Sequence, residues 1–252
     1  MKEPVALKVF PKGMNLDKAV LLKEAENLIR LNSKHVVRLW GVCTSIEPML
    51  VLEYMERGNL RHVLDTTEPS QLPCHRRIQM ALDGALGLYR IHHMPRAMLH
   101  LDLASHKFLV NANWEVKISD VGMAKTCTSI RKQSKHPIGS SSIHYICPER
   151  IKDINLAPDE SMEVYSYGII MWEIATGLKL LEDKKDKCTT NFVLENKDKF
   201  PFPPTVTNEG FKTLIDKCRN SHPLGRPTSS EIVDTLQGLR SALGASMGVG
   251  WV

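Results

Sequence analysis

The sequence lacks the features of several specialised protein classes. No run of about eighteen apolar residues is present, which is the length that a membrane-spanning helix needs. The first ten residues, MKEPVALKVF, do not have the layout of a signal peptide. The six cysteines are scattered without a CxxC pair, which argues against a zinc module and against a disulfide framework. We therefore expect a soluble cytoplasmic protein with reduced cysteines in its interior.

The chain also lacks a strong charge of one sign. Its 33 Lys and Arg residues against 28 Asp and Glu residues give a net charge of +5, and lysines alternate with acids, as in LEDKKDK at 181–187. A dedicated nucleic-acid binder more often carries a one-signed basic stripe, so we expect no nucleic-acid partner. The hydrophobic content of 42% is ordinary for a globular chain, and 252 residues suffice for two packed lobes.

The first quarter of the sequence has the pattern of a small α+β unit. Three short apolar runs are typical of buried strands: VALKVF at 5–10, VVRLWGV at 36–42 and MLVLEYM at 49–55. Between the first two runs, residues 16–31 place leucine and valine side chains on one face of a helix.

After Gly58 and Asn59 the pattern becomes mainly helical. The sequence predicts helices over residues 77–93, 161–175, 211–218 and 229–239. The signal is either apolar residues at three- and four-residue spacing or a capping motif before an apolar run. The run FLVNANWEVKI at 108–118 has two β-rich halves around Asn-Ala-Asn, which predicts a hairpin. Residues 126–142 are rich in Ser, Thr and Lys and predict a long exposed loop of the kind that is usually functional.

These patterns predict an α+β architecture with two lobes. We expect a small β-rich lobe over residues 1–55, a large helical lobe over 56–240 and a glycine-rich C-terminal tail over 241–252 that frays. The cleft between the lobes is then the default functional site.

Several short motifs carry the candidate chemistry. Lys8 lies within VALK, Glu24 lies on the following helix, and HLD (100–102) and DVG (120–122) flank the predicted hairpin. Each motif alone is weak, because a strand lysine or a helix glutamate is usually just solvated. In this order, and followed by CPE (147–149), they resemble the signature of protein kinases.

The resemblance implies a role for each of these residues. Lys8, fixed by Glu24, would hold the phosphates of ATP, and Asp120 would chelate magnesium. Asp102 would orient and deprotonate the accepting hydroxyl group.

Further residues match the kinase pattern outside the phosphate site. Leu52 stands at the gatekeeper position, and Glu53 and Met55 belong to the hinge that offers backbone groups to adenine. Glu149 and Arg226 stand where kinases form a structural ion pair.

The same region departs from the kinase pattern at several positions. Leu101 replaces the arginine of the catalytic loop, and Lys107 replaces an asparagine that binds metal. Lysine has three donors and no acceptor, so it cannot coordinate a cation and instead puts a positive charge where the second magnesium would sit. Like charges about 4 Å apart repel by roughly 4 kcal/mol at an effective dielectric constant near 20.

Other departures affect the phosphate contacts and the lid. Ala104 and His106 stand where kinases carry a phosphate-facing cation, and Glu163 replaces an aspartate. No GxGxxG motif precedes Val5, so we expect either a fragment or a half-open nucleotide site. Together these changes favour a pseudokinase, in which any ATP binding is weak and magnesium binding is disfavoured.

A closer resemblance lies in five segments: GLYRIHH (87–93), AKTCTSI (124–130), SSSIHYICPERIK (140–152), EVYSYGIIMWEIATG (163–177) and GRPTSSEI (225–232). They are similar to the pseudokinase domains of the mixed lineage kinase domain-like family, the terminal effectors of necroptosis. The resemblance implies that a receptor-interacting Ser/Thr kinase phosphorylates Thr128 and Ser129. Each phosphate would lie beside basic residues and reorder the loop; otherwise the loop is simply solvated.

Two differences from that family limit the comparison. Its members often lose both catalytic-site aspartates, whereas this chain keeps Asp102 and Asp120. The family's amino-terminal helical bundle, which attacks membranes, has no counterpart here. We therefore expect no direct membrane binding by this segment, although full-length relatives move to the plasma membrane on activation.

The leading hypothesis is a phosphorylation-controlled pseudokinase switch and docking surface in necroptotic signalling. Two alternatives stay open: a weakly active Ser/Thr or Tyr kinase, and a constitutive interaction scaffold. Self-association of the domain is not decided by the sequence.

Overall fold

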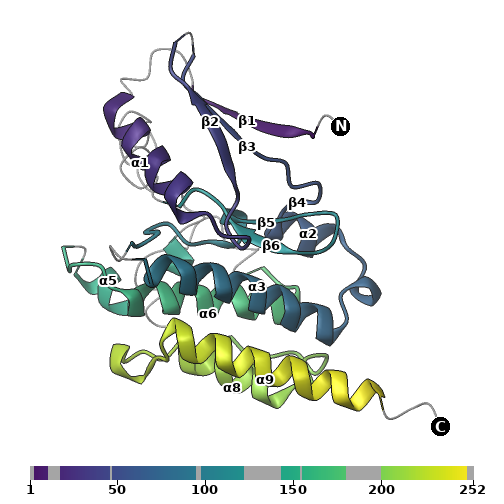
Figure 1. The fold of residues 1–252 in the computed structure, drawn as a ribbon. Coiled ribbons are helices and arrows are strands. Elements are labelled where there is room, and N and C mark those ends of the chain that lie inside the picture. Colours follow the sequence, from purple (N-terminus) through teal and green to yellow (C-terminus); the bar gives the residue numbers. More distant parts are fainter. Residues whose placement is uncertain are drawn as a thin grey trace, which may run out of the picture.

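The fold has a small upper part with strands and one helix and a larger, mostly helical lower part (Figure 1). The computed structural model describes residues 3–10, 18–45, 47–94, 98–121, 143–153, 155–179 and 200–248. The arrangement confirms the predicted α+β fold with two lobes. The predicted loop at 126–142, with Thr128 and Ser129, lies outside the described residues.

The upper part is a three-stranded antiparallel sheet with helix α1 beside it. Its strand order is β1 (Val5–Val9), β3 (Met49–Glu53) and β2 (Leu39–Cys43), and α1 spans Lys18–Leu31. One face of α1, with Leu21 and Leu31, is fully buried, which explains why the helix forms at this position.

Strand β2 is shorter than the sequence predicts. The run at 36–42 was expected to be one strand, but β2 begins at Leu39, and Val36 instead forms a parallel bridge with Ile118. Ile118 N–H donates to the His35 carbonyl (3.0 Å), and Val37 N–H donates to the Ile118 carbonyl (2.8 Å). The loop after α1 is therefore hydrogen-bonded to the lower part, a pairing that no local pattern encodes.

A second small sheet forms the top of the lower part. It consists of β4 (Gly58–Asn59), β5 (Phe108–Val110) and β6 (Val116–Ile118) in that order, and the antiparallel pairing of β5 with β6 confirms the predicted hairpin. The break predicted at Gly58 is a turn with a positive φ of 75°. Asn59 then caps α2 (Leu60–Thr66), because its Oδ1 accepts the His62 N–H at 2.9 Å.

The lower part is built mainly from helices. The longer ones are α3 (Cys74–His92), α6 (Glu160–Thr176), α8 (Glu209–Cys218) and α9 (Ser229–Gly248). The shorter ones are α5 (Pro148–Lys152) and the 3-10 turns η1 (Pro69–Gln71), η2 (Ser105–Lys107), η3 (Ile143–Tyr145) and η4 (Pro223–Gly225). None of the helices in the described segments has an apolar stretch long enough to cross a membrane.

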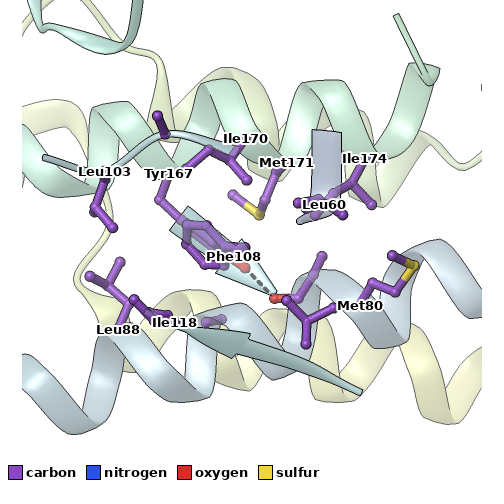
Figure 2. Close-up of a cluster of buried hydrophobic side chains, with 14 of the residues drawn as sticks. Leu60, Met80, Leu88, Leu103, Phe108, Ile118, Tyr167, Ile170, Met171 and Ile174 are labelled. Atoms are coloured by element: carbon purple, nitrogen blue, oxygen red, sulfur yellow. Dashed lines mark hydrogen bonds between the residues drawn. The ribbon is translucent and has the colours of Figure 1, made fainter. Parts of the chain in front are cut away.

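The core lies where α3 and α6 meet the second sheet (Figure 2). Helix α6 is apolar on almost every side because its neighbours surround it. The Tyr167 hydroxyl donates to the Ala81 carbonyl, and the Tyr167 ring packs 5.8 Å from that of Phe108. A side chain at Gly84 would meet the Tyr167 hydroxyl at 2.8 Å, so only glycine allows this approach of α3 to α6.

Two expectations about the edges of the fold need correction. Helix α9 continues to Gly248 instead of ending at residue 239, because Leu239 and Leu243 still pack against the core. The four described cysteines carry thiols, not disulfides, but only Cys147 and Cys218 are buried. Cys74 is exposed at the start of α3, so burial is not a general property of these thiols.

Candidate functional site

The two lobes are joined by an ion pair between the strand lysine and the aspartate of DVG. Lys8 lies opposite Leu50 in the upper sheet, and its Nζ donates to Asp120 Oδ1 at 2.6 Å. Asp120 follows β6 and has a positive φ of 58°, which turns the chain after Ser119. The Lys8 side chain is 34% exposed and that of Asp120 is 14% exposed.

A second lysine reaches the same carboxylate from the catalytic loop. Lys107 ends the short turn η2, and its Nζ donates to Asp120 Oδ2 at 2.7 Å. The same Nζ lies 3.5 Å from Asp102 Oδ2. Lys8, Asp120, Lys107 and Asp102 thus form an alternating group of charges, which we call the lysine–aspartate cluster.

The two ammonium groups control the ionisation of Asp120. Burial by itself would raise the pKa of this carboxyl. The charges and hydrogen bonds of Lys8 and Lys107 outweigh burial and hold the pKa well below its usual range. Asp120 is therefore a carboxylate at every physiological pH, with both oxygens engaged.

The arrangement does not fit the magnesium ion that the kinase resemblance implies. Magnesium needs near-octahedral oxygen ligands, and both oxygens of Asp120 accept from ammonium groups instead. Lys107 stands in the place of the asparagine ligand and adds positive charge.

The backbone around Asp102 is held by a buried glutamate of α6. Leu101 has a positive φ of 64°, and its N–H donates to Glu163 Oε1 at 2.7 Å. The other oxygen of Glu163 lies 3.0 Å from His92 Nε2, at the end of α3. Glu163, which replaces the usual aspartate, therefore anchors the catalytic loop despite its extra methylene group.

The pair expected at CPE is present as a two-pronged contact. Arg226 donates to Glu149 Oε1 at 2.6 Å and to Oε2 at 2.9 Å, and its side chain is fully buried. Burial opposes ionisation of Glu149, but the bonds from Arg226 outweigh it and lower the pKa of Glu149. This geometry is the strongest form of an Arg–carboxylate contact.

The expected hinge follows β3. Leu52 is half-buried in β3 opposite Ala6, and Met55 is buried with its carbonyl accepting the Gly58 N–H at 3.0 Å. Glu53 Oε2 accepts the Arg38 N–H at 3.1 Å. The backbone of Glu24 lies on α1, but its side chain is outside the described residues.

Sequence reasoning missed a buried network beside the catalytic loop. Glu173 is 1% exposed on α6, and its carboxylate accepts from Arg61 of α2 at 3.3 Å and from the Tyr145 hydroxyl at 2.9 Å. The Tyr145 hydroxyl also contacts Ser105 Oγ at 2.9 Å. A single glutamate in the apolar run IIMWEIATG was the available signal, because a buried acid needs partners.

Comparisons with known proteins agree with this geometry. The family model described as protein tyrosine and serine/threonine kinase matches residues 1–236. The chain is 30% identical to human mixed lineage kinase domain-like protein over 93% of its length, and 32% identical to the mouse protein over 90%. It spans about half the length of those two relatives, 52% and 49% respectively.

A further relative carries the name of a kinase. Mouse receptor-interacting serine/threonine-protein kinase 4 is 31% identical over 87% of this chain, which covers 28% of that protein. The family match agrees with the order of the kinase motifs in the sequence. It also agrees with the contacts that Lys8, Glu149 and Glu163 make. The chain therefore belongs to the protein tyrosine and serine/threonine kinase family.

Proposed function

We propose that this domain is a pseudokinase that works as a phosphorylation-controlled switch in necroptotic signalling. The observation that carries the proposal is the contact of Lys107 with Asp120 at 2.7 Å, which replaces a metal contact with an ammonium group. The likeness to mixed lineage kinase domain-like proteins supports the signalling role. Residues 1–55 would form the upper lobe and 56–240 the lower lobe, while the tail proposed over 241–252 begins inside helix α9.

The lysine–aspartate cluster explains why phosphoryl transfer would be poor. Transfer depends on metal ions that neutralise charge on the transferring phosphoryl group. In this domain Lys107 already neutralises Asp120 and lies 3.5 Å from Asp102, the vestigial base. Losing about 3 kcal/mol of transition-state stabilisation would slow the reaction roughly a hundredfold.

A nucleotide site without metal remains compatible with this geometry. Lys8 would contact the phosphates, while Leu52, Glu53 and Met55 would border the adenine. We propose that ATP binds weakly there and that its occupancy biases the conformation of the domain. Such a bias requires different affinities for two conformations.

The upstream partner in this proposal is a receptor-interacting Ser/Thr kinase that phosphorylates Thr128 and Ser129. Two phosphates would add three to four negative charges, by roughly 1.5 to 2 per group, beside Arg131 and Lys132. We place the domain in the cytoplasm and assign it no direct membrane contact. In full-length relatives, the amino-terminal helical bundle would be the part that acts on the membrane.

A thermal-shift experiment with ATP tests the role of Lys107. We expect any stabilisation of the wild type to be the same with and without magnesium, because an ammonium group occupies the metal position. Lys107→Asn should make the stabilisation magnesium-dependent, whereas Lys152→Asn, at an exposed position on α5, should behave as the wild type. A large magnesium-dependent rise in the wild-type melting temperature would refute the proposal.

The rival function is a weakly active protein kinase, which the retention of Lys8, Asp102 and Asp120 in one cluster favours. Transfer of radiolabelled phosphate from ATP to a generic protein substrate distinguishes the two. Transfer that Asp102→Asn abolishes would establish the kinase and overturn the inert switch.

Hydrogen exchange distinguishes a switch from a constitutive scaffold. A variant with Thr128→Glu and Ser129→Glu should change the amide protection of elements outside the loop if the domain is a switch. Identical protection in the variant and the wild type would indicate a scaffold that does not respond to phosphorylation.

A further inference from the structure

A pocket lies away from the lysine–aspartate cluster and shares no residue with it. It has a volume of about 480 Å³ and opens between the loop after α1, the first half of α3 and the β5–β6 hairpin. Lys34, His35, His75, Arg76, Asp83 and Trp114 are among its lining residues. The volume is in the range of small-molecule sites, and two of its titratable groups, Asp83 and His35, have shifted pKa values.

The acidic groups of the pocket are already engaged by protein donors. Asp83 accepts from Gln79 Nε2 at 2.8 Å and from the Val116 N–H at 3.2 Å. Glu115 Oε2 accepts from Asn111 Nδ2 at 2.6 Å. The hydrogen-bonding needs of these carboxylates are therefore met within the protein, although the donors are neutral.

The basic groups of the pocket are in the opposite situation. Within the described part of the chain, the side chains of Lys34, His35 and His75 make no hydrogen bond or ion pair. Burial lowers the pKa of His35, and the nearby charges of Lys34 and Lys117 lower it further. The pocket thus offers donors and positive potential that an anion with several acceptor oxygens would satisfy.

An aromatic wall stands beside these donors and is held rigidly. The guanidinium carbon of Arg57 lies 3.8 Å from the centroid of the Trp114 ring, and that of Arg76 lies 4.7 Å from it. Trp114 also has a positive φ of 67°, which is sparsely populated for any residue other than glycine. A fixed indole next to unpaired donors suits a ligand with an organic part as well as an anionic group.

We propose that this pocket is a binding site for a small organic phosphate, independent of the nucleotide site. The phosphate would accept hydrogen bonds from Lys34, His75 and protonated His35. The organic part would lie against the edge of Trp114, because Arg57 and Arg76 lie over its ring. A phosphate group supplies nearly two negative charges and three acceptor oxygens, which matches the three available side chains.

The position of the pocket gives such a ligand a structural effect. The backbone of His35 is already hydrogen-bonded to β6 through its carbonyl (3.0 Å). A ligand that contacts His35 and His75 together would link the loop after α1 to helix α3, in addition to its existing link to β6. The ligand should therefore protect amides of residues 33–37 from hydrogen exchange.

Nuclear magnetic resonance of the histidine rings tests the proposal directly. The probes are inorganic phosphate, phenyl phosphate and benzoate, each titrated at constant ionic strength. We expect saturable shifts of the His35 and His75 signals, a rise in the pKa of His35, and about tenfold tighter binding of phenyl phosphate than of inorganic phosphate. Benzoate that binds as tightly as phenyl phosphate would overturn the assignment to a phosphate.

Two double variants supply the matched comparison. Lys34→Ala with His75→Gln removes two exposed donors of the pocket and should weaken phenyl phosphate binding by about tenfold or more. Lys152→Ala with His222→Gln makes the same changes at exposed positions that do not line the pocket and should bind as the wild type. Equal affinity of the two double variants would overturn the site.

A variant of the nucleotide site separates the two sites. Lys8→Met removes the lysine that is proposed to contact the phosphates of ATP. The His35 shift caused by phenyl phosphate should be the same in Lys8→Met as in the wild type, whatever the outcome of the ATP experiment above. Loss of the shift in Lys8→Met would place the phosphate in the nucleotide site and refute the proposal.

Discussion

Two carboxylates of the kinase motifs, Glu149 and Asp120, are paired in opposite ways. Glu149 receives one guanidinium group, from the fully buried Arg226, through two parallel hydrogen bonds. Asp120 receives two ammonium groups, one from each lobe. The first pair matches one charge with one charge and fits a structural role. The second has an excess of cations where a kinase would bind metal.

A third carboxylate, Asp83, is more deeply buried and completes the comparison, because both of its hydrogen-bond donors are neutral. Burial raises its pKa to about 6, and the bonds from Val116 N–H and Gln79 only partly oppose this rise. Among these three residues the pKa is raised at Asp83, which has no cationic donor, and lowered at Glu149 with one cation and at Asp120 with two. Four predictions test this statement.

The largest effect is expected at the framework pair. Arg226→Ala would leave Glu149 without its partner and should lower the free energy of unfolding by about 3–5 kcal/mol. For a domain of this size the melting temperature should fall by about 10 °C. Arg240→Ala, at an exposed position of α9, is the matched control and should change stability by less than about 1 kcal/mol. An equally small effect of both variants would break the comparison.

The next effect concerns pH and Asp83. Because folding raises the pKa of this group from 3.8 to about 6, the folded state binds more protons than the unfolded state between those values. The contribution of protonated Asp83 to the free energy of unfolding is complete below pH 4 and is lost as the pH rises through 6. The total loss is roughly 3 kcal/mol.

Urea unfolding at several pH values measures this loss. Asp83→Asn should remove most of the decrease between pH 4 and pH 7 relative to the wild type. Asp234→Asn, at an exposed position of α9, should leave the decrease in place. A wild-type profile that Asp83→Asn does not alter would show that Asp83 ionises freely.

A double-mutant cycle tests the two-cation arrangement of Asp120. Asp120→Asn leaves two ammonium groups without their shared anion and should lower the free energy of unfolding by about 2 kcal/mol. Adding Lys107→Met to this variant should recover part of the lost free energy of unfolding, because it removes the repulsion between the ammonium groups of Lys8 and Lys107. We expect a coupling energy of about 1–2 kcal/mol between the two substitutions. Strictly additive effects would mean that Lys107 and Asp120 do not interact in solution.

The smallest effect on stability is expected at Lys8. Its side chain is 34% exposed, and ion pairs of this kind contribute about 1 kcal/mol or less. Lys8→Met should therefore unfold in urea almost as the wild type does, while any thermal shift caused by ATP decreases. Lys18→Met, at the exposed start of α1, should keep both properties. A strong loss of folding stability in Lys8→Met would show that the ion pair holds the lobes together.

Much of the fold follows from local pattern. The β5–β6 hairpin follows from Asn-Ala-Asn between two β-rich runs, and α3 follows from its three- and four-residue apolar spacing. The two-residue strand β4 and the one-turn helix α5 were not predicted, because elements this short contain too few residues to show a periodic pattern. The bridge of Val36 to Ile118 escaped for a different reason, because its partner is more than 80 residues away.

The candidate site divides in the same way. Lys8, Asp102, Lys107 and Asp120 were all found from motif order. The pairing of Lys107 with Asp120, however, depends on where η2 and the end of β6 lie relative to each other. Arg61 and Tyr145 carry no motif, and only their contacts with Glu173 reveal them.

The amino-acid sequence alone determined which charged groups this protein possesses and in what order they follow its strands and helices, because periodicity and capping act over a few neighbouring residues. It could not determine which ammonium group faces which carboxylate. Tertiary structure decided that question, since distance and burial, not sequence separation, set the strength of a charge interaction.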